Sequence, residues 1–193
     1  MAVAALLLTG CSQVGAAATI GDIKITQATV QASVDSILAE RAKVDTAQMQ
    51  LETGEALNRG QLRFHLYSAI LRAIGAELKM EVTKAEIDTR RASILDQVGG
   101  AEFLPTALVN AGIAPGDLDT YIEIISFSEK ISQALTASGV TEDQIGIETQ
   151  NLVAAKANEL GVTINPRYGK WDAEVADIVA DDPASSAVNP SGN

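Results

Sequence analysis

The sequence is poor in the residue types that most often carry out chemistry. Its 193 residues include one cysteine, Cys11, and one histidine, His65. A single cysteine excludes an internal disulfide, and without a second histidine or a nearby thiol a zinc site has little support. Aromatic residues make up only 4% of the chain, so we expect a core of aliphatic side chains. No metal or cofactor is expected.

Motifs of nucleotide binding and of acyl transfer are also missing. Gly99 and Gly100 lack the Lys-Ser/Thr pair that follows a phosphate-binding loop, and the end of a helix explains them. No serine lies in a Gly-x-Ser-x-Gly sequence. We interpret the scattered carboxylates as solvated surface charge and His65 as a boundary residue satisfied by a backbone or carboxylate partner. We therefore expect that the protein is not an enzyme.

The charge of the chain is strongly acidic and uneven. Its formal net charge is −11, and residues 1–95, with ten acids and ten bases, contribute nothing to it. The whole excess comes from residues 96–193, which hold fifteen acids and four bases. Binding to phosphate backbones needs a basic surface, so this balance argues against a nucleic-acid partner.

An apolar run at residues 2–8 ends at Leu8 and is followed by Thr9, Gly10 and Cys11. This pattern resembles the lipobox of bacterial lipoproteins, which implies cleavage before Cys11 and acylation of its thiol. Each buried acyl CH₂ contributes ~0.8 kcal/mol, so two or more chains anchor a protein to a membrane. A signal peptide requires a basic residue before its apolar run, and none is present here. We therefore expect the true start to lie upstream. The alternative is a short N-terminus with a chance cysteine.

Apolar spacing predicts a mainly α fold of about six short helices. Thr26 is expected to cap the first helix, and residues 45–57 are expected to form a loop. From Asn58 a strong helix is predicted, with a core stripe formed by Leu62, Leu66, Ile70, Ile74 and Leu78. Thr83 and Glu86 form a capping box before a helix that ends at Gly99. Ile87, Ile94, Leu95 and Val98 are expected to be buried.

Two extended segments flank these helices. Residues 19–25 alternate between apolar and polar side chains, and residues 162–164 are β-branched. A lone strand is unstable in water, so we expect the two segments to pair as a small two-stranded sheet that closes the domain. Residues 12–18 are predicted to be a tether, and residues 173–193 a disordered acidic tail.

Three segments in order resemble the N-terminal chaperone domain of the SurA-type and PrsA-type extracytoplasmic folding factors. They are the strand-turn-strand element at residues 20–26, the block 71–131 with its Val82, Thr83, Glu86 and Ile87 junction, and the closing segment 160–171. The resemblance covers residues 19–172. Family members usually insert parvulin prolyl-isomerase domains before the closing segment. Only residues 136–142 stand there in this sequence, so we expect no isomerase activity.

The resemblance implies a chaperone or holdase, anchored by lipid on the extracytoplasmic face of the cell membrane. Its partners would be unfolded or partly folded secreted proteins. The client-binding groove is predicted from the apolar stripes and the aromatic pair of the closing segment: Leu62, Leu66, Ile122, Ile125, Tyr168 and Trp171. The alternative function is an envelope lipoprotein that docks onto one specific protein partner.

Overall fold

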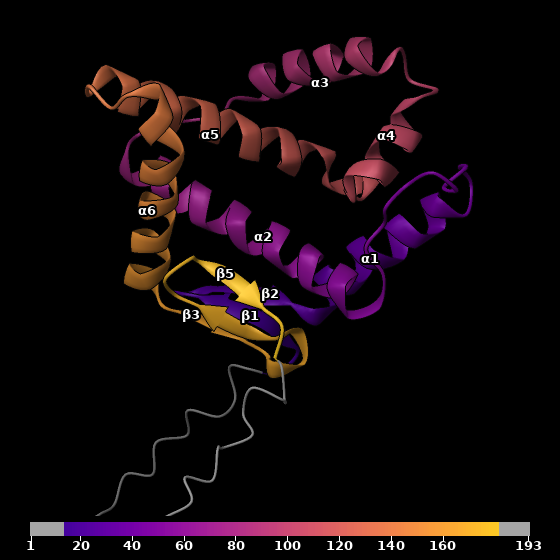
Figure 1. Cartoon of the computed structure of the whole chain (residues 1–193), viewed down its shortest axis with the longest axis horizontal. Helices are drawn as coiled ribbons and strands as arrows, with labels where there is room; N and C mark the ends of the chain where they lie inside the picture. The colour runs from indigo at the N-terminus through magenta and orange to yellow at the C-terminus, as the bar shows by residue number, and fades with distance from the viewer. Residues whose placement is uncertain (1–13, 182–193) are drawn as a thin grey trace, which may run out of the picture.

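The computed structural model describes residues 14–181, and Cys11 with the expected lipobox lies outside them. The fold is mainly helical, with small antiparallel sheets (Figure 1). In chain order the elements are β1 (Ala16–Ile20), β2 (Ile23–Thr26), α1 (Gln27–Arg41), α2 (Gly54–Glu77), α3 (Lys84–Val98), α4 (Leu104–Ala111), the 3₁₀ turn η1 (Pro115–Asp117), α5 (Leu118–Ala137), α6 (Glu142–Leu160), β3 (Val162–Ile164), the 3₁₀ turn η2 (Pro166–Tyr168), β4 (Lys170–Asp172) and β5 (Asp177–Val179).

The N-terminal and C-terminal extended segments meet, as predicted. Strand β1 pairs antiparallel with β3, with Ala18 opposite Ile164 and Ile20 opposite Val162. The sheet has three strands in the order β2-β1-β3, so the expectation of two strands was wrong. The third strand arises because the chain reverses at Gly21, whose φ of +53° is readily accessible to glycine, and β2 folds back on β1.

Both ends of the folded body extend further than predicted. Strand β1 begins at Ala16, inside the expected tether 12–18, because Ala17 and Ala18 are small enough to be fully buried against the core. Strand β5 lies inside the expected tail 173–193 and pairs with β4, placing Ile178 opposite Trp171. Burial of Ile178 in the main core explains why this acidic segment folds.

Helix α2 is the centre of the structure. It contacts α1, α5, α6 and β1, and in Figure 1 it lies between the sheet and α5. The helix begins at Gly54, four residues before the predicted start. Four of the five predicted stripe residues are at most 2% exposed, and Leu78 is 45% exposed because the helix ends at Glu77. Burying one such side chain contributes about 1.5–3 kcal/mol, so this stripe is a substantial source of packing energy. The four buried residues of the stripe are Leu62, Leu66, Ile70 and Ile74.

Helix α3 lies at the outside of the molecule, next to α5 (Figure 1). The predicted capping box forms, since the Thr83 hydroxyl accepts from the Glu86 N–H and the Glu86 carboxylate accepts from the Thr83 N–H. Hydrogen bonds from Lys130 and then from Thr83 lower the pKa of Glu86 to about 2. No residue of α3 is fully buried, so the expectation for Ile87, Ile94, Leu95 and Val98 was wrong. Ion pairs to α5 replace part of that packing: Lys130–Glu86, Arg90–Glu129 and Arg91–Asp119.

Helices α2 and α5 pack closely at Gly75. A Cβ atom at this position would overlap the ring of Phe127, which is buried in the main core. A cavity lies between the same two helices nearer their N-terminal ends, lined there by Phe64 and Tyr67 of α2 and by Tyr121 and Ile124 of α5. Gly75 therefore sets how close α2 and α5 come together.

Among the helices of residues 14–181, none combines the length and apolar character that a membrane span requires.

We predict that Gly75→Ala destabilises the protein. Overpacking against Phe127 costs about 1–3 kcal/mol, which exceeds the gain of up to about 1 kcal/mol in helix propensity. Gly146→Ala is the matched control, because Gly146 lies on α6 and a Cβ there meets open space. Urea unfolding should show a lower midpoint for Gly75→Ala and an unchanged or higher one for Gly146→Ala. A midpoint raised equally by both substitutions would contradict the close crossing.

Candidate functional site

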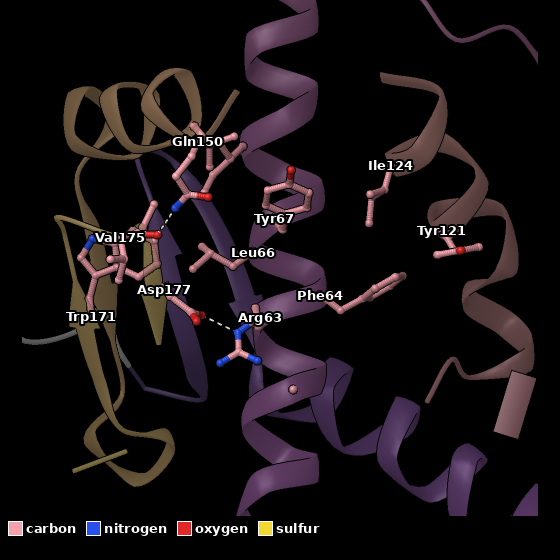
Figure 2. Close-up of a pocket in the computed structure, with 14 residues that line it drawn as sticks. Arg63, Phe64, Leu66, Tyr67, Tyr121, Ile124, Gln150, Trp171, Val175 and Asp177 are labelled. Carbon is pink, nitrogen blue, oxygen red and sulfur yellow. Dashed lines mark hydrogen bonds and ion pairs between the residues drawn. The ribbon is translucent and has the colours of Figure 1, made fainter. Parts of the chain in front are cut away.

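A cavity of about 610 Å³ lies between α2, α5, α6 and the β4–β5 hairpin (Figure 2). Its walls hold four of the seven aromatic residues of the whole chain. We call it the aromatic groove, defined by Phe64 and Tyr67 of α2, Tyr121 of α5 and Trp171 of β4. The other lining residues are Gly60, Arg63, Leu66, Ile70, Ile124, Gln150, Val153, Val175, Ala176 and Asp177.

Helix periodicity places the aromatic side chains. Phe64 and Tyr67 are three residues apart, so they project from neighbouring positions on one face of α2. Figure 2 shows Phe64 extending toward Tyr121 on α5, with Tyr67 beside it facing Ile124. Trp171 lies on the other side of α2, on the strand that pairs with β5. The floor is apolar, because Leu66, Ile70 and Val153 belong to the main core.

Polar contacts at the rim hold the hairpin in place. The Arg63 guanidinium donates to the Asp177 carboxylate and to the Ile178 carbonyl, the latter at 3.2 Å. The Gln150 amide donates to the Val175 carbonyl. Both Arg63 and Asp177 are substantially exposed, so their ion pair contributes about 0–1 kcal/mol. These contacts position the hairpin wall and leave the interior of the aromatic groove apolar.

A second cavity of about 360 Å³ adjoins the aromatic groove, and Gly60, Phe64 and Tyr121 line both. We call it the polar cavity. It lies between the N-terminal part of α2, the loop before α2 and the end of α4. Its remaining lining residues are Arg41, Gln50, Leu51, Glu52, Leu57, Gln61, Asn110, Ala111, Gly112 and Ile113.

The space between α3 and α5 forms a further hollow of about 580 Å³ with a polar lining. All four of its charged side chains are used in ion pairs, Glu86 with Lys130 and Arg90 with Glu129. These pairs fasten the two helices together. Within residues 14–181, no three His, Cys, Asp or Glu side chains gather in a metal-binding arrangement.

The structure separates the six predicted groove residues. Leu66 and Trp171 line the aromatic groove. Leu62 and Ile122 are completely buried, and Tyr168 is 4% exposed, so these three are core residues. Ile125 is partly buried and lies outside the lining. Client binding by any of them stays a prediction.

Sequence reasoning missed Phe64, Tyr67, Tyr121 and Ile124. The apolar stripe of α2 marks the face that packs into the core, and the groove lies on the neighbouring face. One signal was available. Phe64 and Tyr67 are aromatic residues at helical spacing beside the stripe, in a chain with few aromatics.

His65 lies in a polar network beneath the groove. The Ser33 hydroxyl donates to the Asp117 carboxylate at 2.6 Å and lies 2.9 Å from His65 Nε2. Since the Ser33 proton goes to Asp117, His65 Nε2–H donates to Ser33. This network joins α1, α2 and η1. The hydrogen-bond partner of His65 is therefore a hydroxyl and not the expected backbone or carboxylate group, although the Asp117 carboxylate lies 4.0 Å from Nε2.

The network is not an acyl-transfer triad. In a triad the histidine lies between the carboxylate and the serine, whereas here Ser33 lies between His65 and Asp117. Ser33 is also only 5% exposed, so substrate does not reach its hydroxyl. The arrangement is structural.

We predict that stability falls as the pH drops below 6.5. Burial lowers the pKa of His65, against an opposing effect of Asp117 and with a further lowering by Arg72. The unfolded chain then binds a proton between pH 6.5 and the lower folded pKa while the folded chain does not, so acidification favours unfolding. Urea unfolding at pH 7.5 and 5.5 measures this loss.

His65→Gln is the matched variant, because glutamine keeps a side-chain N–H donor but does not titrate. Its unfolding free energy should change less between the two pH values than that of the wild type. An equal change in both proteins would contradict a buried, neutral His65.

Comparisons of the sequence with protein-family models and with curated proteins, and of the structure with solved structures, gave no match.

Proposed function

We propose that this protein binds non-native polypeptide segments in the aromatic groove and acts as a holdase without ATP. The observation that carries this proposal is the groove itself, a cavity of about 610 Å³ with four aromatic side chains above an apolar floor. Large clefts with apolar and aromatic linings and a few polar groups are typical binding sites. Tyrosine and tryptophan combine apolar area with a polar edge, which suits ligands that vary in sequence.

The geometry favours binding over catalysis. The charged groups at the groove rim, Arg63 and Asp177, are paired with each other. The one histidine, His65, is held in the network with Ser33 and Asp117. Binding by coverage of apolar surface is broad in specificity, as a holdase requires.

The proposal includes the extracytoplasmic location and the lipid anchor at Cys11. Support comes from the lipobox-like sequence and from the resemblance to SurA-type chaperone domains. That resemblance implies a helical core closed by a C-terminal strand, and the pairing of β1 with β3 is in keeping with such an architecture. The clients would then be secreted proteins on the outer face of the membrane.

We predict that Tyr67→Ala weakens holdase activity. Removing one groove aromatic should lower client affinity about fivefold, corresponding to ~1 kcal/mol. The measurement is light scattering of a thermally unfolding test enzyme, titrated with increasing amounts of each variant. Phe103→Ala is the matched control, since Phe103 is 54% exposed and does not line the groove.

The expected result is full suppression of scattering by the wild type and Phe103→Ala, with about five times more Tyr67→Ala needed for the same effect. Equal losses in both variants would assign the activity to general surface hydrophobicity and contradict the proposal. Absence of suppression, together with capture of one specific envelope protein, would favour the docking alternative.

A further inference from the structure

The aromatic groove and the polar cavity lie next to each other along α2. They share Gly60, Phe64 and Tyr121, and their combined lining on α2 runs from Leu57 to Ile70. At about 1.5 Å of rise per residue, this stretch is roughly 20 Å long. An extended polypeptide advances about 3.3 Å per residue, so about six residues fit along it.

The two parts differ in chemistry. The aromatic groove suits apolar side chains. The polar cavity also has a largely apolar surface, but several amide and charged side chains add hydrogen-bonding groups to it. Gln50 and Asn110 are exposed amides, and within residues 14–181 neither side chain makes a hydrogen bond. An amide carries both donors and acceptors, as a peptide main chain does. The polar cavity therefore offers partners for main-chain N–H and C=O groups.

The charges of the polar cavity point the same way. The Arg41 guanidinium donates to the Glu52 carbonyl at 2.7 Å, and within residues 14–181 no carboxylate forms an ion pair with it. The Glu52 carboxylate lies over Gly60, in the same cavity. A cation and an anion together give the cavity no net charge. This balance fits a neutral main chain better than it fits a phosphate or a free carboxylate.

We propose that the aromatic groove and the polar cavity form one site for an extended peptide segment about six residues long. Apolar side chains of the segment enter the aromatic groove. The adjoining main chain lies in the polar cavity and bonds to Gln50, Asn110 and the Arg41–Glu52 pair. This inference rests on the proposed function, and it specifies the length and conformation of the bound segment.

Gly60 is the position at which a substitution can test the site, because it lines both parts. Its φ is ordinary, and the nearest atoms to an added Cβ belong to the flexible Glu52 side chain. Gly60→Leu is therefore compatible with the helix. Its side chain would fill the junction and displace the Glu52 carboxylate from it, so the variant removes both the space and one of the proposed bonding groups. Gly146→Leu is the matched control, since it places the same side chain on α6 in open space.

The test is a titration with uncharged peptides of three, six and nine residues. The peptides are acetylated, amidated and built from Leu, Ala and Ser. Trp171 is the only tryptophan in the chain and lines the groove, so its fluorescence reports binding directly. We expect Kd to fall about tenfold from three to six residues as main-chain hydrogen bonds are added. From six to nine residues we expect a change of about twofold or less.

Gly60→Leu should bind the six-residue peptide only as well as the three-residue one, and Gly146→Leu should behave as the wild type. Gln50→Ala and Asn110→Ala, at exposed positions, form a second line of evidence and should each weaken the six-residue peptide about threefold. Equal affinity for all three peptide lengths would overturn this inference and leave the proposed function standing. The same would follow if Gly60→Leu showed the full fall in Kd from the three-residue to the six-residue peptide. Absence of binding by every peptide would contradict both.

Discussion

The packing of the Leu62–Leu66–Ile70–Ile74 face of α2 is the interaction on which the rest of the structure depends. This face is buried against the sheet, α5 and α6, and it fixes the position of the neighbouring face that carries Phe64 and Tyr67. At Gly75, which carries no side chain, the ring of Phe127 from α5 packs directly against α2. The same helix thus builds the core with one face and the candidate site with another.

The general architecture followed from the sequence. Strand pairing between remote segments was predicted because a lone strand needs a partner, and β1 and β3 do pair, although β1 also pairs with the adjacent β2. Local signals such as Thr26, Thr83 with Glu86, and Gly99 correctly marked helix ends, since capping depends on a few adjacent residues. Helix ends are decided by the chemistry of a few adjacent residues, and the strand pairing follows because a lone strand is unstable in water.

Other features depend on contacts that no local pattern reveals. Alanine has no preference for strands, so residues 16–18 were predicted to belong to the tether, whereas their small side chains are buried in the core. The β4–β5 hairpin rests on one buried residue, Ile178, in an otherwise acidic segment. In the candidate site, Leu66 and Trp171 were predicted, but the stripe rule also selected core residues such as Leu62 and Ile122.

The central claim is that unfolded chains bind at the aromatic groove rather than elsewhere on the surface. Photo-crosslinking tests it most directly, with a benzophenone side chain placed at Tyr67 in one variant and at Phe103 in another. Both are mixed with a permanently unfolded, reduced and carboxymethylated client. The account predicts a covalent adduct from position 67 and none from position 103. Adducts from both positions in equal yield, or from position 103 alone, would contradict it.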